Sequence, residues 1–263
     1  MKVRKTVSIS LFKELLNSCS VVKETACLDT EIVSILDNSK STNIVSFLNF
    51  HAINISVKNK AYYSVMTEAD YLYRDGVGVE IALKAMSKES GLNMNGTDFI
   101  PKIISASIDK NMPIILWGTE LEYLSKARTI INDQGGDVID VMDGFQQTEA
   151  YISKLKKLDV NNAVIILGMG MPKQEFLAEK IKENFPSGYS IINGGAIIDF
   201  IAGKQPRAPI LMRKLKLEFL FRLLKEPKRL FRRTVLGGIQ FILATALLFI
   251  HNILGSFSGK KYK

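Results

Sequence analysis

With 263 residues, 47% of them hydrophobic, the chain is long and apolar enough for a buried core in one large α/β domain or two small ones. Disorder is therefore not the expected state. The two cysteines, Cys19 and Cys27, form neither a disulfide framework nor a metal-ligand pattern, and they suit a reducing cytoplasm. Thr6 to Glu14 alternates polar and apolar residues instead of forming an apolar run, so we expect no cleavable export signal.

The net charge of +9 is concentrated toward the C-terminus. Lys204 to Arg233 holds 11 Lys or Arg and two acidic residues, and three lysines follow, so residues 1–203 carry a charge of −3. Such a segment favours anionic partners: nucleic acid, phospholipid headgroups or a phosphorylated substrate. The 23 residues from Val235 to Phe257 contain no Lys, Arg, Asp or Glu. This sequence of a basic and then an apolar segment favours a membrane over nucleic acid.

The apolar segment after Arg233 is long enough for several arrangements. As a helix its 23 residues reach about 34 Å, which is enough to span a hydrocarbon core of about 30 Å. The same segment can instead lie in the membrane interface or fold back onto the body as a buried helix. If it spans the membrane, the basic flank before it is expected on the cytoplasmic side.

From about residue 44 the sequence alternates short β-rich runs with helical segments. The expected strands cover residues 44–48, 71–73, 113–117, 138–141, 163–167 and 189–192. The expected helices cover about 58–68, 79–88, 98–109, 120–132, 148–157 and 172–184. This alternation predicts an α/β, Rossmann-like fold with a mainly parallel sheet and helices on both faces. We assign residues 1–210 to this domain and 211–263 to a helical, membrane-associated appendage.

Ligands of open parallel sheets bind beyond the carboxyl ends of the strands, so the glycine-containing turns there are candidate sites. In Gly168-Met-Gly-Met-Pro-Lys-Gln-Glu175, the glycines allow close backbone approach and Pro172 suits the first residue of a helix. A helix N-terminus suits a diphosphate, and Gln174 and Glu175 are placed to bind a sugar or ribose. The alternative is a plain strand-to-helix turn. A dinucleotide fingerprint would need a third glycine where Lys173 stands.

Asp75-Gly-Val-Gly78 places a carboxylate at the end of another expected strand. Asp75 can act there as a general base toward a sugar hydroxyl, or it can cap the next helix. Asn49 and His51 follow the first expected strand, and His51 either orients a substrate or is structural.

Two further segments combine glycine or apolar residues with basic side chains. After the Gly-rich turn of residues 193–203, Arg207 is either a phosphate clamp or a surface ion-pair partner. The amphipathic segment Leu217 to Arg233 is either a basic surface helix or an appendage that binds a diphosphate and contacts the membrane.

These residues occur in an order and spacing that resemble the WecG/TagA/CpsF family of glycosyltransferases (family 26 type), from about Asn43 to Arg233. The blocks that carry the resemblance are Asp75–Gly78, Gly96–Asp98, Gly168–Glu175, Gly194-Gly195, Asp199, Gly203, Arg207–Pro209, Glu218, Arg222, Glu226-Pro227 and Arg229. The resemblance implies inverting transfer from a UDP-sugar to a sugar on undecaprenyl diphosphate. It places this reaction in cell-surface polysaccharide or teichoic-acid-type synthesis, at the cytoplasmic face of the bacterial cell membrane.

Within that resemblance, Asp75 matches the proposed catalytic base, and an arginine-rich appendage completes the active site at the membrane. The expected substrate contacts are Asn49, His51, Gly76, Gly78, Asp98, Gly118, Gly168, Gly170, Pro172, Gln174, Glu175, Gly195, Asp199 and Arg207. The expected lipid-diphosphate or membrane contacts are Arg222, Arg229, Arg232 and Arg233. The chain departs from relatives at Phe47, where several carry threonine, and at Asn93, where arginine is frequent; both departures concern which sugars are used.

We expect no metal and no other cofactor, because the sequence contains no Asp-x-Asp triplet and no His, Cys or carboxylate cluster with ligand spacing. Helix N-terminal amides after Gly170 and basic side chains would then stabilise the departing UDP. The expected partners are a UDP-sugar, a polyprenyl-diphosphate-linked sugar and the membrane surface, without nucleic acid; a homo-oligomer is left open. The alternatives are a Rossmann-type oxidoreductase, disfavoured by the missing glycine, and a non-catalytic membrane-anchored scaffold.

Overall fold

A computed structural model describes residues 2–215 and 217–258 of the chain. Its centre is a six-stranded sheet in the order β2-β1-β6-β5-β3-β4, in which every neighbouring pair is parallel. The strands are β1 (Asn43–Leu48), β2 (Tyr71–Arg74), β3 (Ile114–Gly118), β4 (Val138–Asp143), β5 (Ala163–Gly168) and β6 (Tyr189–Asn193). The predicted parallel α/β sheet is confirmed, with each strand within two residues of its expected bounds.

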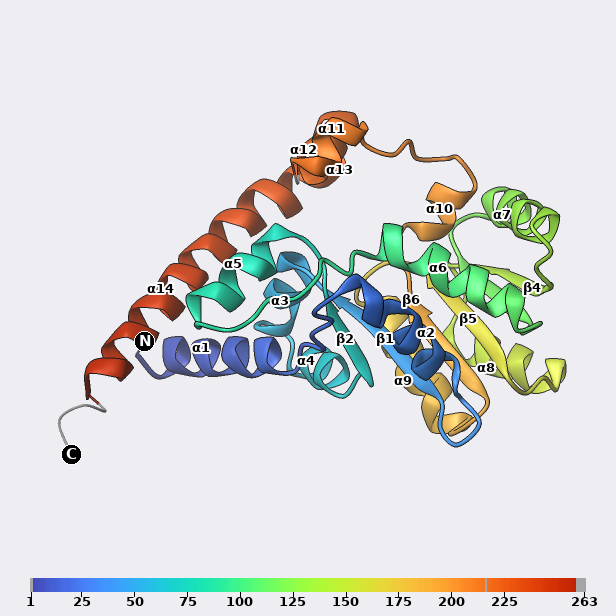
Figure 1. Ribbon diagram of the computed structural model, residues 1–263, viewed down its shortest axis with the longest axis horizontal. Helices are drawn as coiled ribbons and strands as arrows, with labels where there is room; N and C mark the ends of the chain where they lie inside the picture. Colours follow the sequence, from blue (N-terminus) through green and yellow to red (C-terminus); the bar gives the residue numbers. More distant parts are fainter. Residues whose placement is uncertain (1, 216, 259–263) are drawn as a thin grey trace.

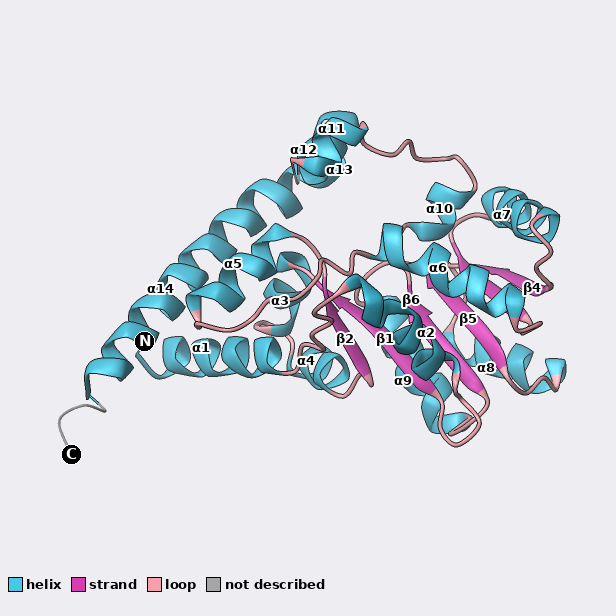
Figure 2. Ribbon diagram, in the orientation of Figure 1, coloured by secondary structure: helices cyan, strands magenta, loops and turns pink. Residues whose placement is uncertain are grey.

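Helices cover both faces of this sheet (Figure 2). Apolar residues of α2 (Leu28–Leu36), α6 (Gly96–Asp109), α7 (Leu121–Asp133) and α10 (Ile197–Ile201) form the core on one face. On the other face the core is formed by α8 (Thr148–Leu158) and α9 (Lys173–Asn184). The strands β1, β3 and β6 are buried along their whole length, as expected for strands that are covered on both faces.

A third core lies beside β1 and β2; helices at about 58–68 and 79–88 were expected in this region, but their assembly into a core was not predicted. It is built from α1 (Lys2–Asn17), α3 (Phe50–Ser56), α4 (Lys60–Thr67), α5 (Val77–Ala85) and α14 (Gly237–Ser258). The alternating segment at Thr6 to Glu14 belongs to the helix α1, whose buried Phe12, Leu15 and Leu16 recur at helical spacing. The helices α2 and α3 were also not predicted: α2 lies before residue 44, where the expected alternation begins, and α3 follows β1 directly.

The C-terminal segment folds as a chain of short helices followed by one long helix. They are α11 (Ile210–Lys214), α12 (Glu218–Lys225), α13 (Pro227–Phe231) and the π-helical turn η2 (Arg232–Leu236), which continues into α14. In Figure 1, α14 runs beside α5 and α1 at the end of the molecule opposite β4. In the described part of the chain, one helical stretch, residues 232–252, is apolar and long enough to cross a membrane, with a mean hydropathy of 1.8.

Candidate active site

A cavity of about 620 Å³ lies at the carboxyl ends of β1, β2, β5 and β6. Its walls also include the start of α6 and residues of α12, α13 and η2, so the C-terminal appendage closes one side. Many residues expected from the sequence to be functional line it: Asn49, Asp75, Gly76, Gly78, Asp98, Gly168, Gly170, Gln174, Gly195, Asp199, Arg222 and Arg233. The fold therefore gathers, in one cavity, motifs that are up to 184 residues apart in the sequence.

Asp75 follows the last residue of β2 and is half-buried in this cavity. Its backbone N–H donates to Leu48 O at 2.8 Å, and its carboxylate accepts the side-chain amide of Asn49 at 3.4 Å. The next helix, α5, is capped by Gly76 without a side-chain hydrogen bond, so the capping role considered for Asp75 is wrong. Burial raises the pKa of the Asp75 carboxyl, although Asn49 and the charge of Arg222 act in the opposite direction.

The loop before α6 lies against the strand end that carries Asp75. Asn93 accepts the Gly76 backbone N–H at 2.8 Å. Arg74, buried beside Asp75, donates to Ser90 O at 2.9 Å and to Gly91 O at 2.8 Å. These contacts hold the loop as a wall of the cavity. Arg74 had no role in the sequence-based site and Asn93 was noted only as a departure from relatives, because nothing in the local pattern places this loop beside β2.

The appendage contributes two positive charges that act on Asp75. Both Arg222 and Arg233 line the cavity, and their charges oppose the rise in the Asp75 pKa. Arg222 donates to Glu218 at 2.9 Å, and its guanidinium lies 4.8 Å from the centre of the Phe200 ring. Arg222 therefore joins the appendage to α10 across the cavity. Arg232 is exposed and outside the cavity lining, and the side chain of Arg229 lies outside the described ones.

The glycine loops after β5 and β6 form the floor of the cavity. The backbone N–H groups of Gly170 and Gly195 both donate to the side-chain oxygen of Gln174, at 3.0 and 3.1 Å. The Gly170 amide itself is therefore bonded within the protein, whereas the amides expected to face a diphosphate are those that follow Gly170. The helix α9 begins at Lys173, one residue later than expected. Pro172 is therefore its N-cap and not its first helical residue.

Five of the residues expected to contact substrate lie outside the cavity lining: His51, Gly118, Pro172, Glu175 and Arg207. His51 is on α3, and burial together with the charges of Arg233 and Lys58 lowers its pKa to about 4. Glu175 is fully buried, and Arg207 donates to Asp98 at 2.6 Å, which is the ion-pair alternative for this arginine. Burial alone would raise the pKa of the Asp98 carboxyl, but hydrogen bonds from Asn95 and Arg207 outweigh burial and lower that pKa.

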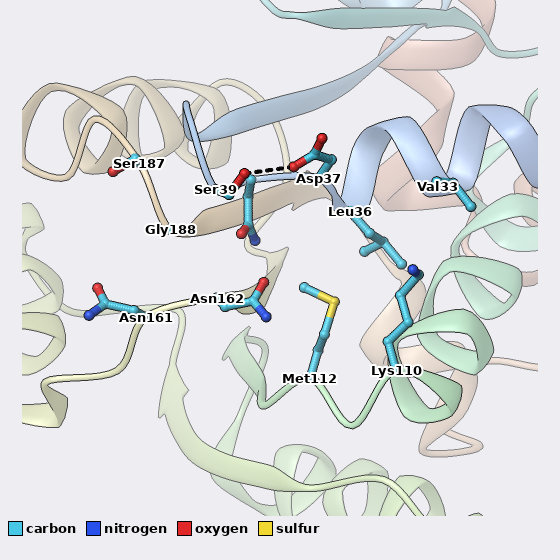
Figure 3. A pocket seen from close by; sticks show the side chains of 11 residues that line it. Val33, Leu36, Asp37, Ser39, Lys110, Met112, Asn161, Asn162, Ser187 and Gly188 are labelled. Atoms are coloured by element: carbon cyan, nitrogen blue, oxygen red, sulfur yellow. Dashed lines mark hydrogen bonds between the residues drawn. The ribbon is translucent and has the colours of Figure 1, made fainter.

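A second cavity, of about 900 Å³, lies at the opposite edge of the sheet (Figure 3). Asn161 and Asn162 line it just before β5, and Gly188 lines it just before β6. Its one carboxylate, on Asp37, accepts a hydrogen bond from Ser39 at 2.9 Å. This edge carries the amino ends of the strands and none of the motifs described above, so the smaller cavity is the candidate active site. Within the described residues, no three His, Cys, Asp or Glu side chains gather as a metal site.

The chain is similar to known glycosyltransferases over most of its length. The model of the glycosyl transferase WecG/TagA/CpsF family matches residues 19–252. An N-acetylglucosaminyldiphosphoundecaprenol N-acetyl-beta-D-mannosaminyltransferase of Bacillus subtilis (strain 168) is 23% identical over 71% of this chain and 73% of its own length. A protein with the same name from Bacillus spizizenii is 25% identical over 74% of this chain and 75% of its own length. The matched region includes every strand, the cavity and most of the appendage, and the chain belongs to the WecG/TagA/CpsF family of glycosyltransferases.

Proposed function

We propose that the protein transfers an N-acetylhexosamine from a UDP-sugar to a sugar carried by a polyprenyl diphosphate, with inversion at the anomeric carbon. The observation that carries this proposal is the half-buried carboxylate of Asp75 in a cavity that also receives Arg222 and Arg233. The two Bacillus relatives are named as N-acetylmannosaminyl transferases that act on N-acetylglucosaminyl-diphospho-undecaprenol. Their names give the sugar class and the lipid acceptor of the proposal.

In the proposed reaction Asp75 takes the proton from the acceptor hydroxyl while the oxygen of that hydroxyl bonds to the anomeric carbon. The bond from that carbon to the UDP oxygen breaks in the same displacement, so the configuration inverts and UDP leaves with the electron pair. A general base must be ionised, and a pKa raised by burial makes its carboxylate a stronger proton acceptor. Positive charge from Arg222 and Arg233 offsets the charge that grows on the diphosphate.

The proposal includes no metal, because the chain has no Asp-x-Asp triplet to hold one at a diphosphate. Charge compensation is assigned to the arginines of the appendage instead. Arginine suits this role, since its planar guanidinium donates two parallel hydrogen bonds to phosphate oxygens.

We also propose that α14 lies along the cytoplasmic face of the cell membrane instead of spanning it. One face of α14 packs on the body: Phe241 and Leu248 are buried, and Asn54 donates to Gly237 O at 2.8 Å. The opposite face exposes a continuous set of large apolar side chains: Ile239, Ile242, Leu243, Leu247, Phe249 and Ile250. A helix with one face on the protein and one apolar face open matches an interfacial helix, and it would hold the cavity near a lipid-linked acceptor.

The proposal is tested with the purified full-length chain in detergent, given UDP-N-acetylmannosamine, UDP-N-acetylglucosamine or UDP-glucose and a polyprenyl-diphosphate-linked N-acetylglucosamine acceptor. We expect acceptor-dependent release of UDP and a product that carries one added N-acetylhexosamine in the inverted configuration. A chain that binds NAD but not UDP would support the oxidoreductase alternative. A chain that binds neither UDP nor NAD, and whose function is unchanged when Asp75 is replaced, would support the scaffold alternative.

A further inference from the structure

Glu175 is a fully buried carboxyl group that the proposed reaction does not use. It lies in the first turn of α9, outside the cavity lining, so it does not reach a bound substrate. One of its oxygens accepts the side-chain N–H of Gln174 at 2.8 Å. Its other oxygen has no hydrogen-bond partner among the described residues. A carboxyl group with an unpartnered oxygen is costly to keep in a core, which indicates a role for its bond to Gln174.

That bond decides which way the Gln174 amide faces. A glutamine side chain ends in one acceptor and one donor group of nearly equal size, and its surroundings select between two orientations. Because Glu175 accepts from the nitrogen, the oxygen of Gln174 faces Gly170 and Gly195, whose N–H groups it accepts at 3.0 and 3.1 Å. The reversed orientation would place an NH₂ group against two backbone donors and would lose all three hydrogen bonds.

The two glycines come from different loops, one after β5 and one after β6. Both have positive φ angles, 79° at Gly170 and 58° at Gly195, and a Cβ on either would meet no atom within 4 Å. The open side of each glycine is therefore free for a ligand, while its N–H points back to Gln174. Gln174 therefore joins the loop after β5 to the loop after β6, in addition to the backbone hydrogen bond from Gly194 N–H to Leu167 O at 2.8 Å.

We propose that Glu175 is a positioning residue that, through Gln174, locks the two glycine loops into the floor of the nucleotide-binding cavity. The chain of contacts runs from a buried carboxylate to a buried amide and from there to two backbone N–H groups. Burial raises the pKa of Glu175 to about 7, although the hydrogen bonds from Gln174 and from its own backbone N–H act in the opposite direction. Only the identity of the ligand, a nucleoside diphosphate, rests on the proposed function.

The decisive variants are Glu175→Met, which removes the acceptor at similar volume, and Glu175→Gln, whose side-chain oxygen can still accept from Gln174. Glu183→Met is the matched control, because Glu183 lies on the same helix and its one ion pair among the described residues, with Lys180, is exposed. Amide hydrogen exchange by mass spectrometry is measured on peptides that cover residues 168–172 and 193–197. Calorimetry with UDP is measured on the same full-length proteins.

In Glu175→Met we expect faster exchange in both loops together and a dissociation constant for UDP raised about tenfold, the order expected from a lost buried hydrogen bond. Glu175→Gln is expected to restore both readouts, and Glu183→Met is expected to match the wild type. Wild-type exchange in both loops of a folded Glu175→Met protein would overturn the proposal, and so would loss of protection in Glu175→Gln equal to that in Glu175→Met.

If Glu175→Met does not fold, Gln174→Met removes the same contacts to both glycines and decides the question. Faster exchange in the two loops supports the proposal, and unchanged exchange overturns it. If the wild type binds no UDP, the proposed donor site fails, but the exchange of the two loops still tests the positioning role. The two failures are therefore distinguishable.

Discussion

Asn49 holds Asp75 with one end of its side chain and the start of α3 with the other. Its amide nitrogen donates to Asp75 at 3.4 Å, and its oxygen accepts the backbone N–H groups of His51 and Ala52, each at 3.0 Å. Because the oxygen is used by the helix, the donor end must face the carboxylate. The residue that caps a helix after β1 thus also orients the carboxylate after β2, which is the neighbouring strand in the sheet.

Replacement of Asp75 by asparagine is expected to lower turnover by about 10²–10⁴, the usual contribution of general-base assistance. The dissociation constant for UDP should stay near the wild-type value, because the variant keeps the size of the side chain. Steady-state transfer and calorimetry with UDP provide the two measurements. Asp75→Asn with wild-type turnover would exclude Asp75 as the base.

The pH profile provides a separate test of the same residue. Asp75 must be ionised to accept a proton, so kcat/KM should fall as pH decreases through its pKa, which burial raises above the ordinary value of about 3.9. Asn49→Ser should move this acid limb to higher pH, since serine still caps α3 but lacks the amide that stabilises the carboxylate. An acid limb that stays in place in this variant, with unchanged thermal stability, would contradict the pairing.

A side chain at Gly170 is expected to weaken UDP binding. Gly170→Ala places a methyl group in the open space of the cavity floor, but it also strains a backbone with φ of 79°. Gly203→Ala is the matched control, because Gly203 has φ of 72° and equal open space but lies outside the cavity lining. Calorimetry should show a raised dissociation constant in the first variant alone; equal values in both would remove Gly170 from the donor site.

Transfer is expected to continue in EDTA. Compensation of the negative charge on the departing UDP is assigned to Arg222 and Arg233, and chelation does not remove their guanidinium groups. The measurement is the initial rate with and without EDTA, followed by addition of Mg²⁺ or Mn²⁺. Loss of activity in EDTA with recovery on either metal would show that the arginines do not suffice.

The parallel sheet could be predicted because the buried strands are short and mostly apolar, as in Ala163–Gly168, and alternate with helical segments. The gathering of Asp75 with Gly168 and Gly195 followed from the rule that strand ends share one edge. Side-chain direction could not be predicted in this way. Glu175 looked like a ligand contact in the sequence, but it is buried behind Gln174, because both residues face the core in the first turn of α9.

The contacts of α14 could not be predicted either. Its composition is apolar all round, so periodicity does not distinguish a spanning helix from one that lies on a protein surface. Its packing on the body depends on α1, α3 and α5, against which Phe241 and Leu248 are buried. Arg207 shows the same limit: its pairing with Asp98 depends on a loop path that no local pattern fixes.

Membrane binding is expected to depend on the outward face of α14. Removal of the whole helix is a poor test, because it also takes Phe241 and Leu248 out of the core. A better variant combines Ile242→Glu and Leu243→Glu, at side chains that are 66% and 61% exposed. Loss of two large apolar side chains from the lipid, each contributing about 1.5–3 kcal/mol, should reduce binding to anionic vesicles at least about 100-fold.

The control for this variant is Phe145→Glu, since Phe145 is 71% exposed next to β4, at the other end of the molecule from α14. UDP binding should be unchanged in both proteins, because neither site touches the cavity. In the α14 variant, transfer to a long polyprenyl acceptor should fall more than transfer to a short, soluble analogue, since only the long acceptor is confined to the bilayer. An α14 variant that still sediments with vesicles and treats both acceptors as the wild type does would show that this face does not contact lipid.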